Sequence, residues 1–151
     1  MIASTHPDWP IARVKPFVDF AVAVVNDGQR RKGIKRKVKP LLKVKRSLNT
    51  WYFGGQAYVG GKEVTVTLGW SGLHEIYPYA QQYRGYKNMP IFTVVSDEEM
   101  MLFLLAHEFQ HLAGTHGNRA GEVYCEWTGW EAVTMLRSRR LQEAENNELM
   151  D

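Results

Sequence analysis

The sequence has little cysteine and no long apolar run, and both features limit what the protein can be. Cys125 is the only cysteine, which excludes an internal disulfide and fits a reducing compartment. The longest apolar run, residues 100–106, is too short to cross a bilayer, and the first residues lack the basic and apolar regions of a signal peptide. We therefore expect a cytoplasmic protein that does not enter a membrane.

Length and composition predict one domain over residues 1–151. The chain is 44% hydrophobic and 12% aromatic, which is enough to bury a core. No second stretch is large enough to build another core, and the sequence has no internal repeats. We expect the chain to fold by itself.

The net charge of +3 hides an asymmetry along the chain. Residues 1–50 have 12 Lys/Arg against 3 Asp/Glu, whereas residues 51–151 have 7 against 13. Ten of the basic residues lie between Arg30 and Arg46, a run that would attract a phosphate backbone. Because this run has no interleaved aromatics, we favour a solvated basic linker at about residues 28–40 over a nucleic-acid site.

Hydrophobic periodicity predicts a helix followed by short strands. Apolar residues recur at helical spacing over residues 11–25, and Asn26-Asp27-Gly28 ends the pattern. Three β-rich segments follow, with Gly60-Gly61 as a hairpin turn between the last two: residues 41–48, 56–59 and 63–68. These segments predict a small, mostly antiparallel sheet. Residues 69–90 have no sustained period and predict a long loop, and residues 91–95 predict a further strand.

Two helices with a short turn between them are the clearest local prediction. Ser96 and Glu99 form a capping box at the start of the first helix, and Gly114 is placed to end it in a left-handed cap. The second helix runs from about residue 119 to 148. We expect the two helices to pack antiparallel.

The first of these helices contains a metal-binding motif. His107-Glu108-Phe109-Gln110-His111 is H-E-x-x-H, a spacing that places two imidazoles one turn apart on one face of a helix. Glu108 points about 100° away, where it can take a proton from the attacking water instead of binding the ion. Burying these polar groups beside apolar faces is costly unless they share a partner. The pattern predicts Zn²⁺ held by His107 and His111.

Register on the helical hairpin predicts the remaining groups of the site. Glu122 lies as far into the second helix as His111 lies from the end of the first, so antiparallel packing brings them level. We expect Glu122 to be the third ligand. Glu126, one turn further, is level with His107 and is expected to accept its ring N–H. Gly129 continues this face and is expected to allow a close approach of the helices.

His116 is an alternative third ligand. The stretch from His107 to His116 approaches the metzincin pattern, but the last histidine comes one residue early. We therefore expect His116 to lie at the rim of the cleft. The group that stabilises the oxyanion is left open among five side chains: Tyr79, Tyr83, Tyr86, Tyr124 and His116.

These residues resemble the gluzincin branch of the zincin metallopeptidases, in which a glutamate on the next helix completes H-E-x-x-H. The counterpart here is Glu122 in Glu122-Val-Tyr-Cys125-Glu126, and the spacing is similar to minimal gluzincins and ImmA/IrrE-type metallopeptidases. The resemblance covers about residues 91–135. It implies an α+β fold, with a twisted sheet on the two site helices and an edge strand that binds extended substrate. We expect residues 91–95 to be that strand.

The resulting hypothesis is a zinc-dependent metallopeptidase that hydrolyses a peptide or protein substrate, with Glu108 as general base. Two alternatives stay open. One is a non-catalytic, zinc-stabilised binding module with a closed four-ligand shell. The other is a nucleic-acid-associated protease similar to the SprT-like proteins, which binds DNA or RNA through residues 30–46.

Overall fold

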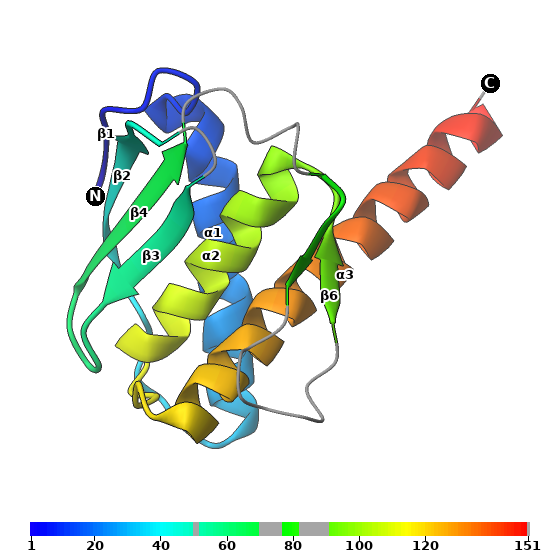
Figure 1. Ribbon diagram of the computed structural model, residues 1–151. Coiled ribbons are helices and arrows are strands. Elements are labelled where there is room, and N and C mark those ends of the chain that lie inside the picture. Colours follow the sequence, from blue (N-terminus) through cyan, green and yellow to red (C-terminus); the bar gives the residue numbers. More distant parts are fainter. Residues whose placement is uncertain (50–51, 70–76, 82–90, 151) are drawn as a thin grey trace.

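Helices cover one face of a four-stranded sheet in the computed structural model, which describes residues 1–49, 52–69, 77–81 and 91–150 (Figure 1). The elements follow in the order β1 (Ile2–Ser4), α1 (Ile11–Arg31), β2 (Leu41–Ser47), β3 (Phe53–Ala57), β4 (Glu63–Gly69), β5 (Tyr79–Gln81), β6 (Phe92–Val94), α2 (Asp97–Leu112) and α3 (Arg119–Met150). The fold therefore mixes helices and sheet, as the sequence predicts.

The sheet is not mostly antiparallel, and that prediction is wrong. Its order is β1-β2-β4-β3, with β1–β2 and β2–β4 parallel and only β3–β4 antiparallel. β1 was not predicted, and α1 joins it to β2 by a crossover long enough to make the two strands parallel. The hairpin between β3 and β4 is confirmed, and Gly60 has the positive φ, +69°, that its turn requires.

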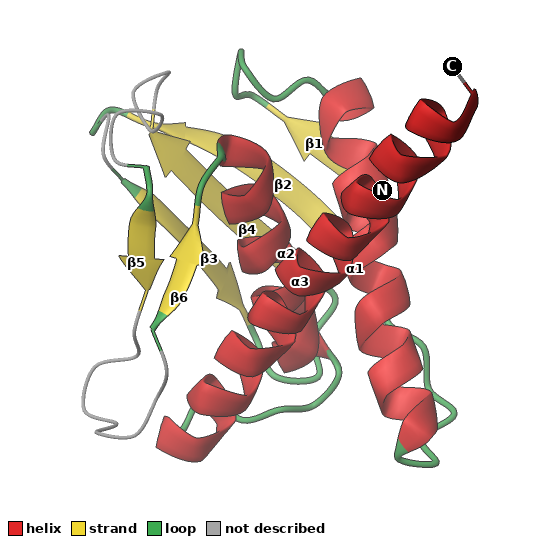
Figure 2. Ribbon diagram, turned by 90° about the vertical axis from the view of Figure 1, so that its right-hand side faces the viewer, coloured by secondary structure: helices red, strands yellow, loops and turns green. Residues whose placement is uncertain are grey.

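The core lies between the sheet and the helices (Figure 2). Burial alternates over the first five residues of β2, with Leu42 and Val44 buried against the helices and Lys43 and Lys45 exposed on the other face. α2 is the central helix, and every residue from Glu99 to Leu112 in it is buried. A helix that is buried on all sides must satisfy its polar side chains with partners inside the protein. The partners of its histidines and glutamates therefore indicate where a functional site lies.

α1 continues to Arg31, six residues beyond the predicted end. Gly28 lies inside the helix, and Gln29 is still buried against α2. Residues 28–31 of the predicted basic linker are therefore helical, and the connection to β2 comprises residues 32–40. Tertiary contact by Gln29 stabilises a turn that the local sequence would end.

The ends of α2 lie where they were predicted, but only the Ser96 half of the predicted capping box forms. Ser96 caps it and accepts a hydrogen bond from the Glu99 N–H at 3.2 Å, and Gly114 closes it with φ +110°. The Glu99 carboxylate instead accepts from the Val95 N–H and from Arg137 of α3. Burial raises and the Arg137 hydrogen bond lowers the pKa of Glu99, and the net shift is downward.

α2 and α3 pack closely, as expected from Gly129. A Cβ at Gly129 would lie 2.8 Å from the Phe103 carbonyl oxygen, below any normal contact. On the other side, β6 pairs with β5 in a separate antiparallel hairpin (Figure 2). The strand predicted at residues 91–95 is confirmed, whereas residues 70–76 and 82–90 of the predicted loop lie outside the described residues. Among the described helices, none is long and apolar enough to cross a membrane.

Candidate metal centre

Two buried imidazoles on α2 face one carboxylate on α3. The Nε2 atom of His107 lies 3.1 Å from Oε2 of Glu122, and the Nε2 atom of His111 lies 2.9 Å from Oε1 of the same group. The two rings are 5.2 Å apart between centroids. The helical hairpin thus brings together the three side chains that the sequence singled out as ligands.

The Nδ1 atom of each ring has a separate acceptor. His107 Nδ1 lies 3.2 Å from Oε1 of Glu126, the acceptor predicted from the hairpin register. His111 Nδ1 lies 2.8 Å from the backbone oxygen of Thr115. A carbonyl oxygen only accepts, so Nδ1 of His111 bears the hydrogen and Nε2 keeps its lone pair in the neutral ring. Both Nε2 atoms are therefore oriented for use as ligands.

Acidic groups outnumber the two imidazoles in this cluster, and their charges dominate its electrostatics. Burial lowers the pKa of His107, but the hydrogen bonds that its ring donates to Glu122 and Glu126, together with the charge of Glu108, outweigh this effect and raise the pKa to about 9. The hydrogen bond to His107 lowers the pKa of Glu122, although burial opposes the shift. The carboxylates that favour a proton on His107 would equally favour a cation beside its ring nitrogen.

Glu108 lies next to His107 and Glu122 but is too far from the His107 ring for a hydrogen bond. Its Oε1 atom is 3.9 Å from His107 Nε2, the nitrogen that faces Glu122. Burial, assisted by the charges of Glu122 and Glu126, raises the pKa of Glu108, while the two histidines oppose that shift. A carboxyl group with a raised pKa next to a candidate metal position is suited to accepting and returning a proton.

The strand next to Glu108 is β3, not the predicted cleft strand at residues 91–95. A Cβ at Gly55 would lie 2.5 Å from Cγ of Glu108 and 2.8 Å from its Oε1. β3 is also an edge strand of the four-stranded sheet and runs along α2, whereas β6 belongs to the other hairpin (Figure 1). Glycine within a strand often marks a close approach of another group, so Gly54-Gly55 was a signal that could have identified this strand.

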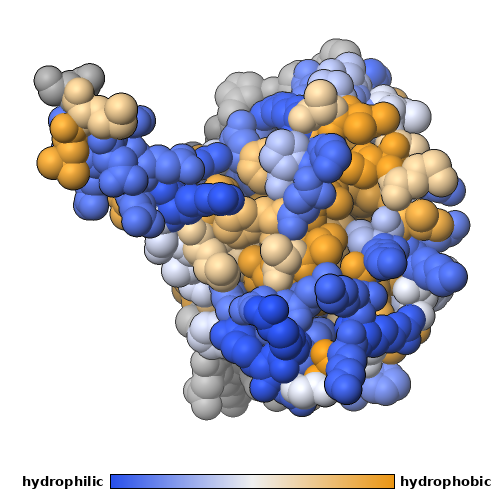
Figure 3. Space-filling view, turned by 180° about the vertical axis from the view of Figure 1, so that it is seen from behind, coloured by the Kyte–Doolittle hydropathy of each residue, from blue (hydrophilic) through white to orange (hydrophobic). Residues whose placement is uncertain are grey.

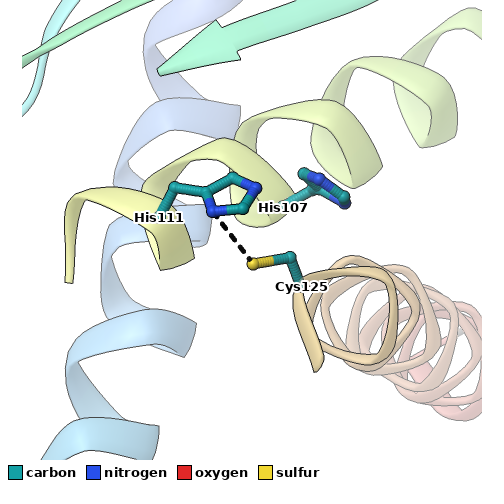
Figure 4. A group of neighbouring side chains, drawn as sticks. All are labelled: His107, His111 and Cys125. Carbon is teal, nitrogen blue, oxygen red and sulfur yellow. Dashed lines mark hydrogen bonds between the residues drawn. The ribbon is translucent and has the colours of Figure 1, made fainter. Parts of the chain in front are cut away.

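Cys125 is a second candidate ligand that the sequence analysis did not assign. His107, His111 and Cys125 each offer an atom within 4.8 Å of the others, and all three are buried (Figure 4). However, the Sγ atom of Cys125 lies 3.6 Å from Nδ1 of His111, and this nitrogen already donates a hydrogen bond to the Thr115 carbonyl. Burial and the charges of Glu122, Glu108 and Glu126 raise the pKa of the Cys125 thiol. We therefore favour Glu122, whose carboxylate is ionised and faces both Nε2 atoms.

A buried amide network supports the turn that holds His111. Gln110 Nε2 donates to Thr115 Oγ1 at 3.0 Å, and Thr128 of α3 donates to Gln110 Oε1 at 3.3 Å. From α1, Gln29 donates to the Ala113 carbonyl at 3.3 Å. These bonds fix the Thr115 carbonyl that accepts from His111. These hydrogen bonds could not be predicted from local sequence patterns, because they connect residues of three different helices and the turn between two of them.

The remaining sequence candidates either have no hydrogen bond, ion pair or ring contact with the paired imidazoles among the described residues or lie outside those residues. His116 is exposed in the turn between α2 and α3. Tyr79 packs edge-on against Phe53 at 4.9 Å, and Tyr124 accepts a hydrogen bond from Lys32. Tyr83 and Tyr86 are outside the described residues.

Taken together, the described side chains offer two nitrogen donors, one carboxylate donor and a nearby proton acceptor. Comparison of the chain with protein-family models, curated proteins and solved structures finds no match.

Proposed function

We propose that the chain is a zinc-dependent metallopeptidase in which His107, His111 and Glu122 hold the ion. The observation that supports it best is the convergence of both Nε2 atoms on the Glu122 carboxylate, with both Nδ1 atoms engaged elsewhere. A carboxylate cannot accept a hydrogen bond from a nitrogen lone pair, so this arrangement requires either extra protons or a cation. Two imidazoles and a carboxylate fit the donor preference of Zn²⁺.

The residues around the ion have separable roles. When bound, Zn²⁺ supplies Lewis acidity that polarises the scissile carbonyl and lowers the pKa of water. Glu108 takes a proton from the attacking water and returns it to the leaving amine. Glu126 and the Thr115 carbonyl hold the rings of His107 and His111 in one tautomer.

β3 is the element we assign to substrate binding. No other described strand pairs with β3 on the side away from β4, so an extended peptide can pair with this edge. Gly55 brings this strand against Glu108, so a peptide bound there would lie close to the general base. A sheet whose edge strand runs along the H-E-x-x-H helix, with a ligand glutamate on the following helix, supports the resemblance to gluzincins.

The experiment combines metal analysis with hydrolysis of a peptide library. The wild type should contain one zinc per chain and cleave peptides, and His107→Ala or His111→Ala should lose both. Glu108→Gln keeps the shape but removes the base, so it should retain zinc and lose about 10²–10⁴ in rate. Glu98→Gln on the same helix is the matched control and should behave as wild type. If the wild type and Glu108→Gln both bind zinc and neither cleaves peptides, the enzyme assignment is wrong.

The position of Cys125 supports one competing function, a zinc-stabilised binding module. If Cys125 joined His107, His111 and Glu122, the ion would have four protein ligands and no open position for substrate. Cobalt substitution separates the two possibilities, since a thiolate ligand gives an intense charge-transfer band in the near ultraviolet. We expect no such band, and Cys125→Ser should keep metal and activity.

The structure distributes the basic run over two surfaces. Lys43 and Lys45 lie on the open face of the sheet, whereas Lys35, Arg36 and Lys37 border a groove beside α1. A nucleic acid that contacted the whole basic run would therefore have to reach both surfaces. The test of a nucleic-acid-associated protease is a steep salt dependence of DNA or RNA binding that disappears when residues 30–46 are neutralised.

A further inference from the structure

A long groove beside α1 has no role in the proposed reaction. It has a volume of about 1340 Å³ and is lined by α1, by residues 33–37 and by α3 near Met135. Phe20, Ala23 and Val24 contribute apolar surface from α1, and Ile34 and Met135 remain 42% and 45% exposed. Figure 3 shows this side of the molecule, where hydrophobic side chains gather in the middle and hydrophilic ones border them. An apolar hollow of this size on a surface indicates a binding site for another element.

The border of the groove is predominantly basic. Five cationic and two anionic side chains line it: Arg30, Lys35, Arg36, Lys37 and Arg139, with Asp19 and Asp27. Arg30 is paired with Asp27, and Arg139 lies 3.9 Å from Glu143 on its own helix, which leaves the excess of positive charge at residues 35–37. Such a border favours an acidic, partly apolar occupant.

The C-terminal part of α3 has that composition. Beyond Arg139 the helix projects from the body, and every side chain from residue 140 to 150 is exposed (Figure 1). Residues 141–150 include Glu143, Glu145 and Glu148 and no Lys or Arg, and Leu141 and Leu149 are 67% and 86% exposed. A helical end of this length is marginal in water unless something packs on it. We call residues 140–150 the projecting segment.

We propose that two copies of the chain form a dimer in which the projecting segment of each lies in the groove of the other. One sequence contains both halves of the contact, an acidic segment with exposed leucines and a basic-rimmed apolar groove. Gln142 and Arg139 line the groove at the base of the segment. A two-fold axis near this point makes the exchange reciprocal and closed, as stable homodimers require. The eleven residues of the segment span about 16 Å of helix.

Charge reversal on each side of the contact tests this dimer. The segment variant has Glu143→Lys, Glu145→Lys and Glu148→Lys, and the groove variant has Lys35→Glu, Arg36→Glu and Lys37→Glu. Sedimentation equilibrium should show a wild-type dimer and, for either variant alone, a dissociation constant raised more than about tenfold by like-charge contacts. Lysine and glutamate have similar helix propensities, so α3 should keep its helicity by circular dichroism.

Mixing the two variants gives the decisive result. The lysine segment of one copy then meets the glutamate-bordered groove of the other, and the second contact is wild type, so the heterodimer should form where neither variant dimerises alone. The control is Lys43→Glu with Lys45→Glu on the open sheet face, which should leave the dimer intact. A monomeric wild type at every concentration would overturn the proposal, as would a dimer that survives both variants or a mixture that stays monomeric. None of these results depends on zinc or on catalysis.

Discussion

Gly55 offers the sharpest test of how β3 and Glu108 work together. In Gly55→Ala the new Cβ would lie 2.5 Å from Cγ of Glu108, whereas ordinary contacts begin at 3.4 Å. The backbone of β3 is held by its pairing with β4, so the Glu108 side chain has to move by about 1 Å. A misplacement of that size costs about 10²-fold in rate when it affects a group that acts on the reacting atoms.

The same change should leave the metal ligands in place. His107, His111 and Glu122 all lie on α2 and α3, and a Cβ at Gly55 meets none of them at its three closest contacts. We therefore expect Gly55→Ala to bind one zinc and to hydrolyse peptides about 10²-fold more slowly, with a stability cost of about 1–3 kcal/mol from overpacking. Metal content, kcat/KM and thermal unfolding measure the three effects separately.

Gly54→Ala is the matched control, because it makes the same substitution on the same strand. Its Cβ would lie 2.9 Å from the Tyr52 hydroxyl, but the Tyr52 side chain is 48% exposed and can adopt another rotamer that points into solvent. We expect near wild-type activity. If Gly55→Ala is as active as Gly54→Ala, the seating of Glu108 against β3 has no part in catalysis. Loss of zinc in Gly55→Ala would instead show that the strand supports the ligands.

Three further predictions concern the ligands and their support. In a competition titration with a chelator, Glu122→Ala should abolish zinc binding, Glu126→Ala should weaken it by about 10- to 100-fold, and His116→Ala should leave it unchanged. If instead His116→Ala loses zinc and Glu122→Ala keeps it, the site has three histidine ligands. Gln110→Ala should lower zinc affinity by about tenfold, because it removes a hydrogen bond to the turn whose carbonyl orients His111. The variant should still unfold cooperatively, and an unchanged zinc affinity would contradict this role. The raised pKa of His107 stabilises the metal-free fold fully below about pH 6.5, and this contribution is lost as the pH rises through about 9. Denaturant unfolding in a chelator should therefore show a decline on the order of 3 kcal/mol across that window, and a flat profile would show that no such proton is held.

Local geometry explains why much of the candidate site followed from the sequence. Residues four apart on a helix face the same way, so His107 and His111 were adjacent once the helix was recognised. The Ser96 cap and Gly114 defined the ends of α2, and a short turn leaves antiparallel packing as the arrangement for the next helix. Register alone then placed Glu122 and Glu126 level with the two rings.

Pairing between distant segments was decided only by the tertiary structure. β-Rich composition identified β2 and β4 as strands, but two of the three pairings in the sheet, β1–β2 and β2–β4, proved to be parallel. The Thr115 carbonyl on His111, the Gly55 contact with Glu108 and the Cys125 thiol also depend on contacts that no local period specifies. Sequence determines which side chains one helix presents together, whereas the neighbours of those side chains depend on how separate elements fill a common core.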